Sequence, residues 1–325
     1  MSNPWHLIAD IGGTNARFAA FRCNHLLAST TYETGHGESL LSMARRFCQS
    51  LSEPPDIAVV AAAGPVSNNA VRLTNADQFL CGEELRAATG ARQAHVINDF
   101  AAAAWAMLEV NPDDLSRISG AIHPTSGTRL VIGPGTGLGV GALTCHHGRW
   151  KAIVGEGGHI GISPRNRFEA EAFEALRTRW PDVAFGDTLT LEAEAILSGT
   201  GLPILYRAVQ DVKGVCTTDI QPDTIFKTAR TGVDPIAETV VTVFKAHLAQ
   251  IAGDLGLVFG AEGGIFFTGG IALKNPWLFD DGFVSHMQAG GRFTPQRTAL
   301  NLYLFQRPDF GLLGARNYAR HALSE

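Results

Sequence analysis

The chain has 325 residues, a length typical of about two domains, and 45% of them are hydrophobic, which is enough to bury two cores. The formal net charge of −5 lacks the basic excess of a nucleic-acid binder, so we expect no nucleic-acid partner. Five cysteines, none in a CxxC pair, argue against disulfides and a thiolate zinc site and favour a reducing compartment. No apolar run reaches the ~18 residues that a spanning helix needs, and the N-terminus has no signal-peptide pattern. We therefore expect a cytoplasmic protein without a membrane partner.

Glycine is the outlier of the composition, with 36 residues in the chain. That is 36/325, or about 11%, against an average near 7%. The glycines gather at the ends of apolar segments. This pattern indicates loops that need unusual backbone angles or a close approach to a ligand.

The first half of the chain predicts an α/β unit, because apolar runs alternate with segments of helical periodicity. A strand, a glycine turn and a second strand at the start indicate a hairpin. Ile57–Ala63 is continuously apolar, which is typical of a parallel strand buried on both faces. The predicted strands are 5–9, 17–21, 26–32, 57–63 and 94–97, and the predicted helices are 40–51, 83–88 and 100–108.

A polar break at Asn111–Asp114 is a candidate domain boundary, and the pattern restarts after it. Residues 130–132 predict a strand, 133–137 a glycine turn and 140–145 a returning strand, so the two halves resemble an ancient duplication. The longest helical stretch is 235–259. Further predicted helices are 168–180, 191–197, 202–209 and 312–322, and further predicted strands are 264–268 and 302–305.

The first glycine turn, Asp10–Asn15, has the composition of a phosphate-binding loop. Glycines after a strand allow backbone N–H groups to converge on a phosphate, and Thr14 adds a hydroxyl donor. Asp10 is suited to hold Mg²⁺ through water, because Mg²⁺ prefers carboxylates and retained waters. An ordinary hairpin turn explains the same residues, so this motif alone leaves both interpretations open.

The second glycine turn begins at Gly133 and contains a misleading match. Gly137–Ala142 formally satisfies the dinucleotide fingerprint, but that fingerprint requires a helix where 140–145 predicts a strand. The chain also has no Gly-Lys-Ser/Thr of a P-loop. The remaining interpretation is a second phosphate-binding hairpin that works together with the first.

Asn98 and Asp99 stand between a predicted strand and a predicted helix. One interpretation is a helix N-cap, for which Asp is well suited. The other is a general base, Asp99, beside an amide, Asn98, that holds a substrate hydroxyl. The sequence leaves both open.

Gly155–His159 places Glu156 and His159 among glycines, so both side chains are uncrowded. A carboxylate accepts two hydrogen bonds side by side, which suits adjacent hydroxyl groups, and a neutral imidazole offers one donor and one acceptor. A surface turn with a satisfied histidine is the alternative. Glu194, taken alone, is a solvated helix residue.

Gly269 and Gly270 end a predicted buried strand. Their backbone is suited to lie against a flat ring such as adenine, and a tight strand-to-helix turn is the alternative.

In this order, these segments resemble the bacterial glucokinase family of the actin-like sugar kinase superfamily. No single motif is specific, but the ordered set is, and it extends nearly to the end of the chain at Gly311–Gly314. The Cys-rich zinc motif of the related ROK kinases is absent, which indicates the zinc-free branch. The matching segments are Asp10–Arg17, Ile97–Phe100, Gly133–Gly139, Gly155–His159, Leu197–Leu202 and Gly269–Ile271.

The resemblance implies a two-domain α/β fold of the actin-like ATPase (ribonuclease-H-like) sugar kinase type with an interdomain cleft. It places 1–109 plus about 301–325 in a small domain and 110–300 in a large one. It implies ATP-dependent phosphorylation of D-glucose at the 6-hydroxyl, with ATP and Mg²⁺ as cofactors. A homodimer is expected, as is common in this family.

The resemblance also assigns roles to residues. Asp99 would be the general base, and the side chains that hold the sugar would be Asn98, Asp99, Glu156, His159 and Glu194. The nucleotide-binding residues would be Asp10, Ile11, Gly12, Gly13, Thr14, Asn15, Gly133, Gly135, Thr136, Gly137, Gly269 and Gly270.

Two other functions fit the same fold. One is a kinase for another hexose, such as fructose or an amino sugar. The other is a non-catalytic sugar sensor, which normally carries a DNA-binding helical domain before the first strand. Here the first strand begins at Trp5, so we expect catalysis. A chaperone-like or filament-forming ATPase would lack the Glu156–His159 motif.

Overall fold

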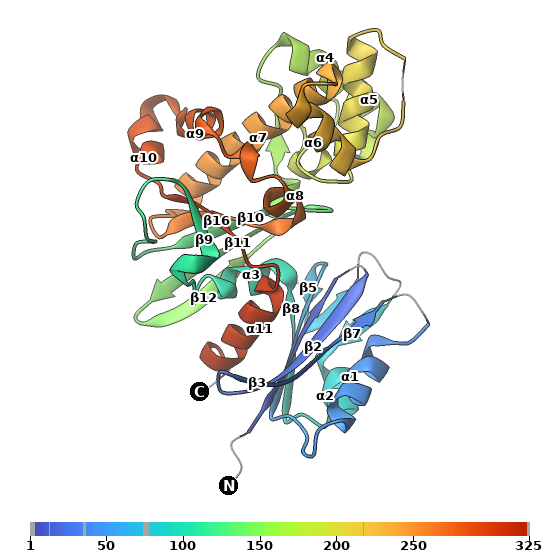
Figure 1. The fold of residues 1–325 in the computed structure, drawn as a ribbon, viewed down its shortest axis with the longest axis vertical. Coiled ribbons are helices and arrows are strands. Elements are labelled where there is room, and N and C mark those ends of the chain that lie inside the picture. Colours follow the sequence, from blue (N-terminus) through green and yellow to red (C-terminus); the bar gives the residue numbers. More distant parts are fainter. Residues whose placement is uncertain (1–3, 13, 35–36, 74–77, 217, 324–325) are drawn as a thin grey trace. The chain divides into compact units, whose positions relative to one another are not determined.

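The computed structural model describes residues 4–12, 14–34, 37–73, 78–216 and 218–323, and the chain divides into two compact units (Figure 1). Unit 1 contains residues 1–111, 141–154 and 307–325. Unit 2 contains residues 112–140 and 155–306.

Among the described residues of unit 1, five strands form a sheet in the order β3-β2-β1-β4-β8. The first three strands make an antiparallel meander, and β4 and β8 run parallel to β1. Both the predicted hairpin and the predicted buried parallel strand are thereby confirmed. The strands are β1 (His6–Ile11), β2 (Asn15–Arg22), β3 (His25–Glu33), β4 (Ile57–Ala62) and β8 (Gln93–Asn98).

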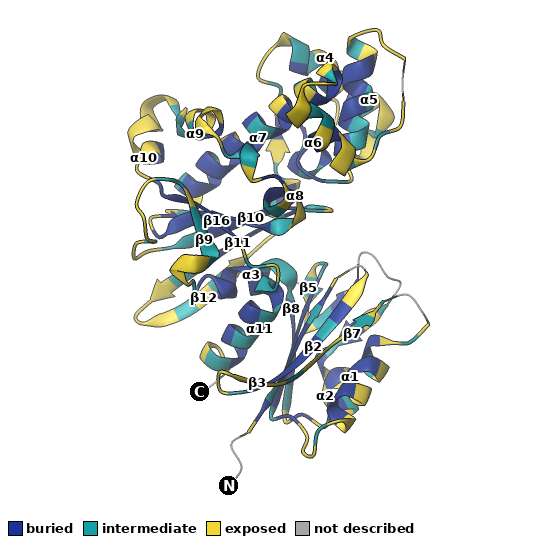
Figure 2. Ribbon diagram, viewed as in Figure 1, coloured by how far each residue is buried: buried dark blue, intermediate teal, exposed yellow. Residues whose placement is uncertain are grey.

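Helices cover both faces of this sheet, as Figure 2 shows by the dark band of buried residues between them. Alternate side chains of one strand enter different cores, since Leu7 packs in the cluster of Phe47 whereas Ile8 packs in that of Ala102. This two-sided burial explains the continuous apolar run of β4. On one face lie α1 (Leu40–Gln49) and α2 (Gly82–Thr89), and on the other α3 (Asp99–Ala106) and α11 (Phe310–His321). A small separate sheet contains β5 (Val66–Ser67), β6 (Ala70–Arg72) and β7 (Phe79–Cys81).

The last helix, α11, packs closely on α3 within unit 1. A side chain at Gly314 would collide with the carbonyl oxygen of Ala102, so only glycine allows this approach. Asn317 donates a hydrogen bond to the Trp105 carbonyl at 3.1 Å, and Arg320 pairs with Glu109 at 2.7 Å. These contacts bring the C-terminal segment back to the first unit.

The sheet of unit 2 contains parallel strands β10, β15 and β16, with β9 antiparallel at the edge. Its longest helix, α7, has the predicted bounds and begins where the Asp234 carboxylate accepts N–H groups of Ile236 and Ala237. The strands are β9 (Leu115–Ser119), β10 (Arg129–Pro134), β13 (Gly161–Ile162), β14 (Leu191–Glu192), β15 (Gly264–Phe267) and β16 (Leu302–Phe305). The helices are α4 (Arg167–Arg179), α5 (Leu202–Val212), α6 (Pro222–Thr231), α7 (Pro235–Phe259), α8 (Gly269–Lys274), α9 (Asp281–Gln288) and α10 (Thr294–Thr298).

The hairpin of β11 (Leu138–His146) and β12 (Arg149–Val154) starts in unit 2 and ends in unit 1. The bounds of the units differ from those expected from the sequence at residues 110–111, which belong to unit 1, and in two longer segments. Residues 141–154 join unit 1 because β12 packs on α3, where Gly141 lies directly against the Phe100 carbonyl. Residues 301–306 join unit 2 because β16 pairs with β15 and β9.

The predicted helix at 191–197 is wrong. Leu191 pairs with Ile162 in the β13–β14 ladder, and the Ala193 N–H donates to the Ile160 carbonyl at 2.9 Å. These backbone bonds fix an extended segment that is followed by a single 3₁₀ turn, η4 (Ala193–Ala195).

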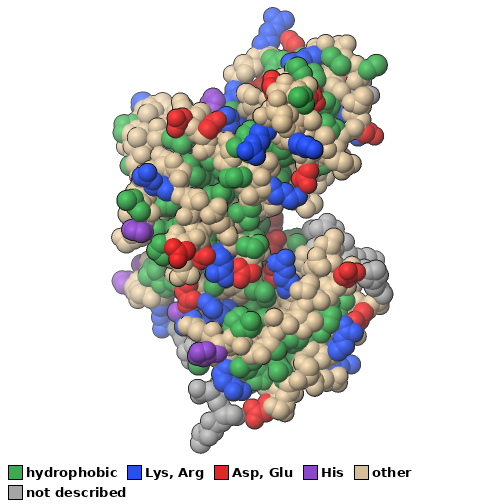
Figure 3. Space-filling model, in the orientation of Figure 1, with side chains coloured by type: hydrophobic (Ala, Val, Ile, Leu, Met, Phe, Trp, Pro, Cys, Tyr) green, Lys and Arg blue, Asp and Glu red, His purple; other side chains and the backbone are tan. Residues whose placement is uncertain are grey.

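Charged side chains of both signs lie on the surface, as the small net charge of the chain leads us to expect. On the face in Figure 3, the described Lys and Arg side chains are interspersed with Asp and Glu rather than gathered into one basic surface. Among the described helices, none has the length and apolar character needed to cross a membrane.

A buried ion network joins α4 to α7 in unit 2. Glu169, only 1% exposed, accepts hydrogen bonds from Arg165 at 2.5 Å and from His247 Nε2 at 3.0 Å. Burial alone would raise the pKa of Glu169, but the bonds from His247 and Arg165 outweigh it and lower the pKa to about 2.

This network yields a prediction for stability. Glu169→Gln should lower the free energy of unfolding at pH 7 by roughly 3 kcal/mol, because it removes the buried carboxylate that both the Arg165 guanidinium and the buried His247 ring contact. Since the folded-state pKa lies below the ordinary 4.5, the stabilisation is complete above pH 4.5 and is lost as the pH falls towards 2. Urea unfolding of both proteins from pH 7 to pH 3.5 measures the difference, which should shrink below pH 4.5.

Glu171→Gln, on the same helix, is the control, because Glu171 pairs with an almost fully exposed Arg167. It should change stability by less than about 1 kcal/mol. Equal losses of unfolding free energy in Glu169→Gln and Glu171→Gln would contradict the stabilising role assigned to the Glu169 network.

Candidate active site

The first glycine turn joins β1 to β2 in unit 1. The Gly12 N–H donates to the Asn15 carbonyl at 2.9 Å, and the Asn15 amide donates to the Thr14 hydroxyl at 3.1 Å. Thr14 and Asn15 are exposed, so a ligand can reach them. Ile11 is buried at the end of β1, and Gly13 lies outside the described residues.

The Asp10 carboxylate lies at the end of β1 against the first turn of α11. A Cβ atom at Gly311 would lie 2.5 Å from Asp10 Oδ1, so glycine is required there. Arg17 is the nearest cation, with Nη1 4.0 Å from Asp10 Oδ2. Burial raises the pKa of Asp10 to about 6, Arg17 opposes that rise and Asp309 adds to it. The protein therefore only partly neutralises this carboxylate, and its hard oxygen atoms fit a Mg²⁺ ion that keeps most of its waters.

At the end of β8, Asn98 rather than Asp99 caps helix α3. Its Oδ1 accepts the N–H groups of Phe100 at 2.8 Å and Ala101 at 3.2 Å, and its Nδ2 donates to the Gly64 carbonyl at 3.0 Å. Asp99 is the first helical residue, and its Oδ1 accepts the Phe100 N–H at 3.0 Å. A negative charge is stabilised at this helix terminus.

In unit 2, the glycine loop Gly133–Gly137 begins with the last two residues of β10 and is hydrogen-bonded to the turn before α5. Gly135 donates its N–H to the Gly137 carbonyl at 2.8 Å, and Gly199 donates to the Gly135 carbonyl at 2.8 Å. The Thr200 hydroxyl donates to the Thr136 carbonyl at 3.0 Å. Because Gly135 uses its N–H inside the loop, Thr136 and Gly137 are the residues whose N–H groups we expect to meet a phosphate.

Gly269, at the start of α8, packs directly on this loop. Its φ of +86° belongs to the left-handed region, and a Cβ atom there would lie 2.8 Å from the Pro134 carbonyl oxygen. Both constraints require glycine. Gly270 follows with open space around it, on a backbone exposed to a ligand.

Glu156 and His159 flank a 3₁₀ turn, η2 (Gly157–His159), that packs on the start of β11. A side chain at Gly158 would collide with the Leu138 carbonyl oxygen, and the His159 N–H donates to the Glu156 carbonyl at 3.0 Å. Glu156 remains exposed. The glycines of this motif therefore permit close packing of the backbone next to Glu156 and His159.

Glu194 contacts the end of the Gly133–Gly137 loop, which is the proposed phosphate loop. Its Oε2 accepts the Leu138 N–H at 2.8 Å, and the same oxygen would lie 2.5 Å from a Cβ at Gly137. Glu194, Glu192 and Glu156 all act electrostatically on His159. The structure therefore brings Glu156, His159 and Glu194 together next to the second glycine loop.

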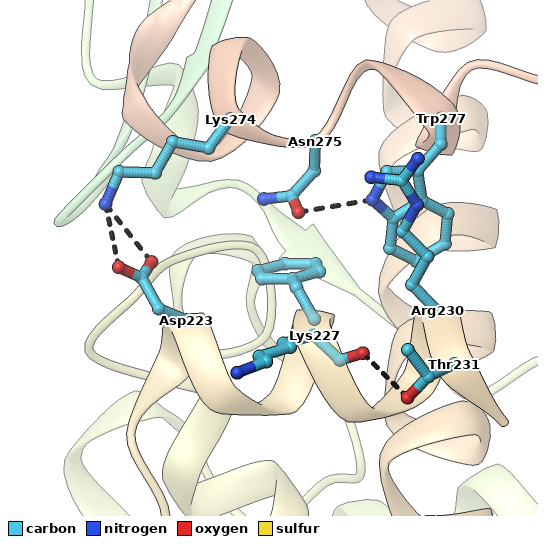
Figure 4. Close-up of a pocket in the computed structure, with 8 residues that line it drawn as sticks. Asp223, Lys227, Arg230, Thr231, Lys274, Asn275 and Trp277 are labelled. Carbon is cyan, nitrogen blue, oxygen red and sulfur yellow. Dashed lines mark hydrogen bonds and ion pairs between the residues drawn. The ribbon is translucent and has the colours of Figure 1, made fainter. Parts of the chain in front are cut away.

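The turn before α5 also contacts the beginning of α6, because a Cβ at Gly199 would lie 3.9 Å from Pro222 Cγ and 3.2 Å from the Gly135 carbonyl oxygen. Beside it, between α6 and the end of α8, lies a cavity of about 480 Å³ (Figure 4). An ion pair between Lys274 and Asp223, at 2.9 Å, stands at one end of it. Its lining residues are Asp223, Phe226, Lys227, Arg230, Thr231, Lys274, Asn275 and Trp277.

Sequence reasoning missed these lining residues and Glu192. Pro222 followed by the apolar pair Ile225 and Phe226 is a helix signal that could have revealed α6. Nothing local distinguishes Glu192, whose partner His159 is 33 positions away.

Asn98 and Asp99 belong to unit 1, whereas the other proposed sugar-binding residues belong to unit 2.

Two α/β units, glycine loops that follow strands, and a cluster of carboxylates and a histidine at one loop define a sugar kinase of the actin-like fold. Comparison with known proteins gives the family. The family model described as Glucokinase matches residues 7–322, so the chain belongs to the glucokinase family.

The chain is 36% identical to the glucokinase of Nitrobacter hamburgensis, with 96% of each chain covered. The solved structure of a glucokinase from an Antarctic psychrotroph superposes with a TM-score of 0.84 at 28% identity, covering 99% of each chain. A ROK family glucokinase from Streptomyces griseus, solved with glucose and AMPPNP, has a TM-score of 0.54 at 18% identity over 97% of this chain and 99% of that one. This last similarity concerns the fold alone.

The packing of Gly269 yields a prediction. Gly269→Ala should destabilise the protein by roughly 1–3 kcal/mol, because it strains a left-handed residue and displaces the Pro134 carbonyl. The displaced loop should also bind AMPPNP at least tenfold more weakly. Urea unfolding and calorimetric titration measure the two effects.

The neighbouring Gly270→Ala is the control, because its added methyl group enters open space. It should leave stability within about 1 kcal/mol of the native value. Equal stability of the two variants would rule out the proposed packing constraint.

Proposed function

We propose that this protein transfers the γ-phosphoryl group of ATP to the 6-hydroxyl group of D-glucose, giving glucose 6-phosphate and ADP. The family match over residues 7–322 carries the activity. The hydrogen bond from Leu138 to Glu194 supports it, because it joins a sugar-binding candidate to a phosphate-binding candidate within one unit. Phosphoryl transfer depends on such positioning more than on covalent chemistry of the protein.

The nucleotide would use both glycine loops, with backbone groups of Gly12, Thr14 and Asn15 in the first and of Thr136 and Gly137 in the second binding its phosphates. The cavity between α6 and α8 would take the nucleoside, since it offers both aromatic and polar side chains and the start of α6 contacts the turn that is hydrogen-bonded to the phosphate loop. Asp10 would hold Mg²⁺ through water. The ion would neutralise charge on the phosphate oxygens.

The sugar hydroxyl groups would be held by Asn98, Glu156, His159 and Glu194. The Asn98 side-chain oxygen is occupied by the cap of α3, so its amide group would donate to the sugar. Carboxylates of Glu156 and Glu194 accept hydroxyl hydrogens. A site built from such groups rejects analogues that lack a hydroxyl, because a buried polar group is then left unpaired.

Asp99 would be the general base. As the sugar O6 forms its bond to the γ-phosphorus, the bond from that phosphorus to the ADP oxygen breaks, and the hydroxyl proton moves to the Asp99 carboxylate. The Phe100 N–H, 3.0 Å from Oδ1, anchors the carboxylate at the end of α3. A positioned base of this kind contributes roughly 10²–10⁴-fold to the rate.

Glu194 would connect the two substrates. One of its oxygens accepts the Leu138 N–H directly after the phosphate loop, and the carboxylate would also accept a sugar hydroxyl. A bound sugar would therefore fix the position of the loop. For the protein as a whole, a homodimer and a cytoplasmic location remain our proposals, and they rest on the family resemblance and on the cysteine usage.

A coupled assay of ADP release tests the function directly. We expect release to depend on glucose, and kcat/KM for glucose to exceed that for fructose, mannose and glucosamine. ADP release that is independent of any sugar, or a higher kcat/KM for another hexose, would contradict the proposal.

Asp99→Asn tests the base. The variant keeps the shape and the helix-terminal hydrogen bond but cannot accept the proton, so kcat should fall by about 10²–10⁴-fold. Glucose affinity, measured by calorimetry, should remain within about fivefold of the native value. Asp113→Asn, at an exposed position in the 3₁₀ turn η1 (Pro112–Asp114), serves as the control and should leave kcat unchanged. Near-native turnover of Asp99→Asn would remove Asp99 from the mechanism.

A further inference from the structure

A second glutamate contacts the proposed sugar-binding histidine. His159 Nδ1 lies 2.9 Å from Glu192 Oε2, in a hydrogen bond that joins the 3₁₀ turn η2 to strand β14. The function proposed above gives Glu192 no role, and its neighbour Glu194 has a separate contact at the phosphate loop.

The backbone fixes both partners of this bond. Glu192 is opposite Gly161 in the β13–β14 ladder, and the next residue, Ala193, donates its N–H to the Ile160 carbonyl at 2.9 Å. His159 is held by its own N–H, which donates to the Glu156 carbonyl at 3.0 Å. The bond therefore joins two rigid segments.

The chemistry of imidazole gives this bond a consequence. When Nδ1 carries the hydrogen that Glu192 accepts, the neutral ring has its lone pair on Nε2. Nε2 can then accept a hydroxyl hydrogen, and it becomes a donor when the ring is protonated. A carboxylate on one ring nitrogen thus determines what the other nitrogen offers to a ligand.

We propose that Glu192 is a positioning residue of the sugar subsite, which holds the His159 ring in its Nδ1–H tautomer and thereby presents Nε2 to a sugar hydroxyl. This inference rests on the proposed function, because it deepens the role of His159 in binding glucose.

A purely structural role explains the bond less well. The side chains of His159 and Glu192 are 46% and 31% exposed, and ion pairs with such exposure contribute only about 0–1 kcal/mol to stability. Loss of the bond should therefore leave the fold intact and change the orientation and charge of the ring.

The carboxylates around His159 also affect its titration. The hydrogen bond to Glu192 raises the pKa of His159, burial lowers it, and the charges of Glu194, Glu192 and Glu156 raise it further. These groups come from η4, β14 and the residue before η2. Removal of the Glu192 charge should therefore lower the pKa of His159. An inflection that His159 causes in the pH profile of kcat/KM for glucose should then move to lower pH.

The test compares Glu192→Gln and Glu192→Ala with the native protein. KM for glucose should rise about tenfold in the Ala variant and less in the Gln variant, which retains an oxygen acceptor. KM for ATP should stay within twofold and Tm within about 2 °C. Glu171→Gln, which removes an exposed carboxylate of α4 from its pair with Arg167, is the matched control and should change none of these values.

A proton NMR titration of the His159 ring, assigned with His159→Gln, provides the readout that a structural role would not change. The pKa of His159 should be lower in Glu192→Gln than in the native protein, and the inflection of kcat/KM for glucose should move in the same direction. An unchanged titration, or equal increases of KM for glucose and for ATP, would overturn the proposal. If the native protein did not phosphorylate glucose, the proposed function would fail, whereas the NMR titration would still test the Glu192–His159 bond itself.

Discussion

The site in unit 2 depends on one hydrogen bond, in which the Glu194 carboxylate accepts the Leu138 N–H. Leu138 is the first residue of β11, directly after the phosphate loop, so the bond fixes where the loop ends and the strand begins. The 3₁₀ turn of Glu156–His159 packs on the same residue from its carbonyl side. The proposed sugar-binding residues Glu194, Glu156 and His159 are thus positioned against one residue at the end of the loop, and in our proposal this contact couples the sugar subsite to the phosphate loop.

Close backbone packing is the second constraint. Gly137, Gly158 and Gly269 each lie where a Cβ atom would meet a neighbouring carboxylate or carbonyl oxygen. The absence of a side chain at each of these positions allows the chain to pack closely on Glu194, Leu138 and Pro134, respectively. At these three positions the packing requires glycine, and in our proposal the glycine loops would bind phosphates through backbone N–H groups.

Local sequence patterns predicted the strands and helices of the protein better than the backbone of its candidate site. The hairpin of β1 and β2 follows from its glycine turn, the buried strand β4 from its continuous apolar run, and helix α7 from its helical periodicity. The segment around Glu194 was predicted as a helix, because its residues favour one. Backbone bonds to Ile160 and Ile162, which are some 30 positions away, override that preference. Similarly, Asn98 takes the helix cap that Asp99 could have made, and its amide donates to the Gly64 carbonyl, a contact 34 positions away that no local pattern predicts.

The coupling between the two substrates is the most direct test of this account. Calorimetric titration with AMPPNP and Mg²⁺, with and without saturating glucose, should show that glucose tightens nucleotide binding in the native protein by about fivefold or more. Glu194→Ala should reduce this ratio to near one, whereas Glu238→Gln, in the first turn of α7, should preserve it. If glucose tightened AMPPNP binding as strongly in Glu194→Ala as in the native protein, the claim that this carboxylate joins the sugar subsite to the phosphate loop would be contradicted.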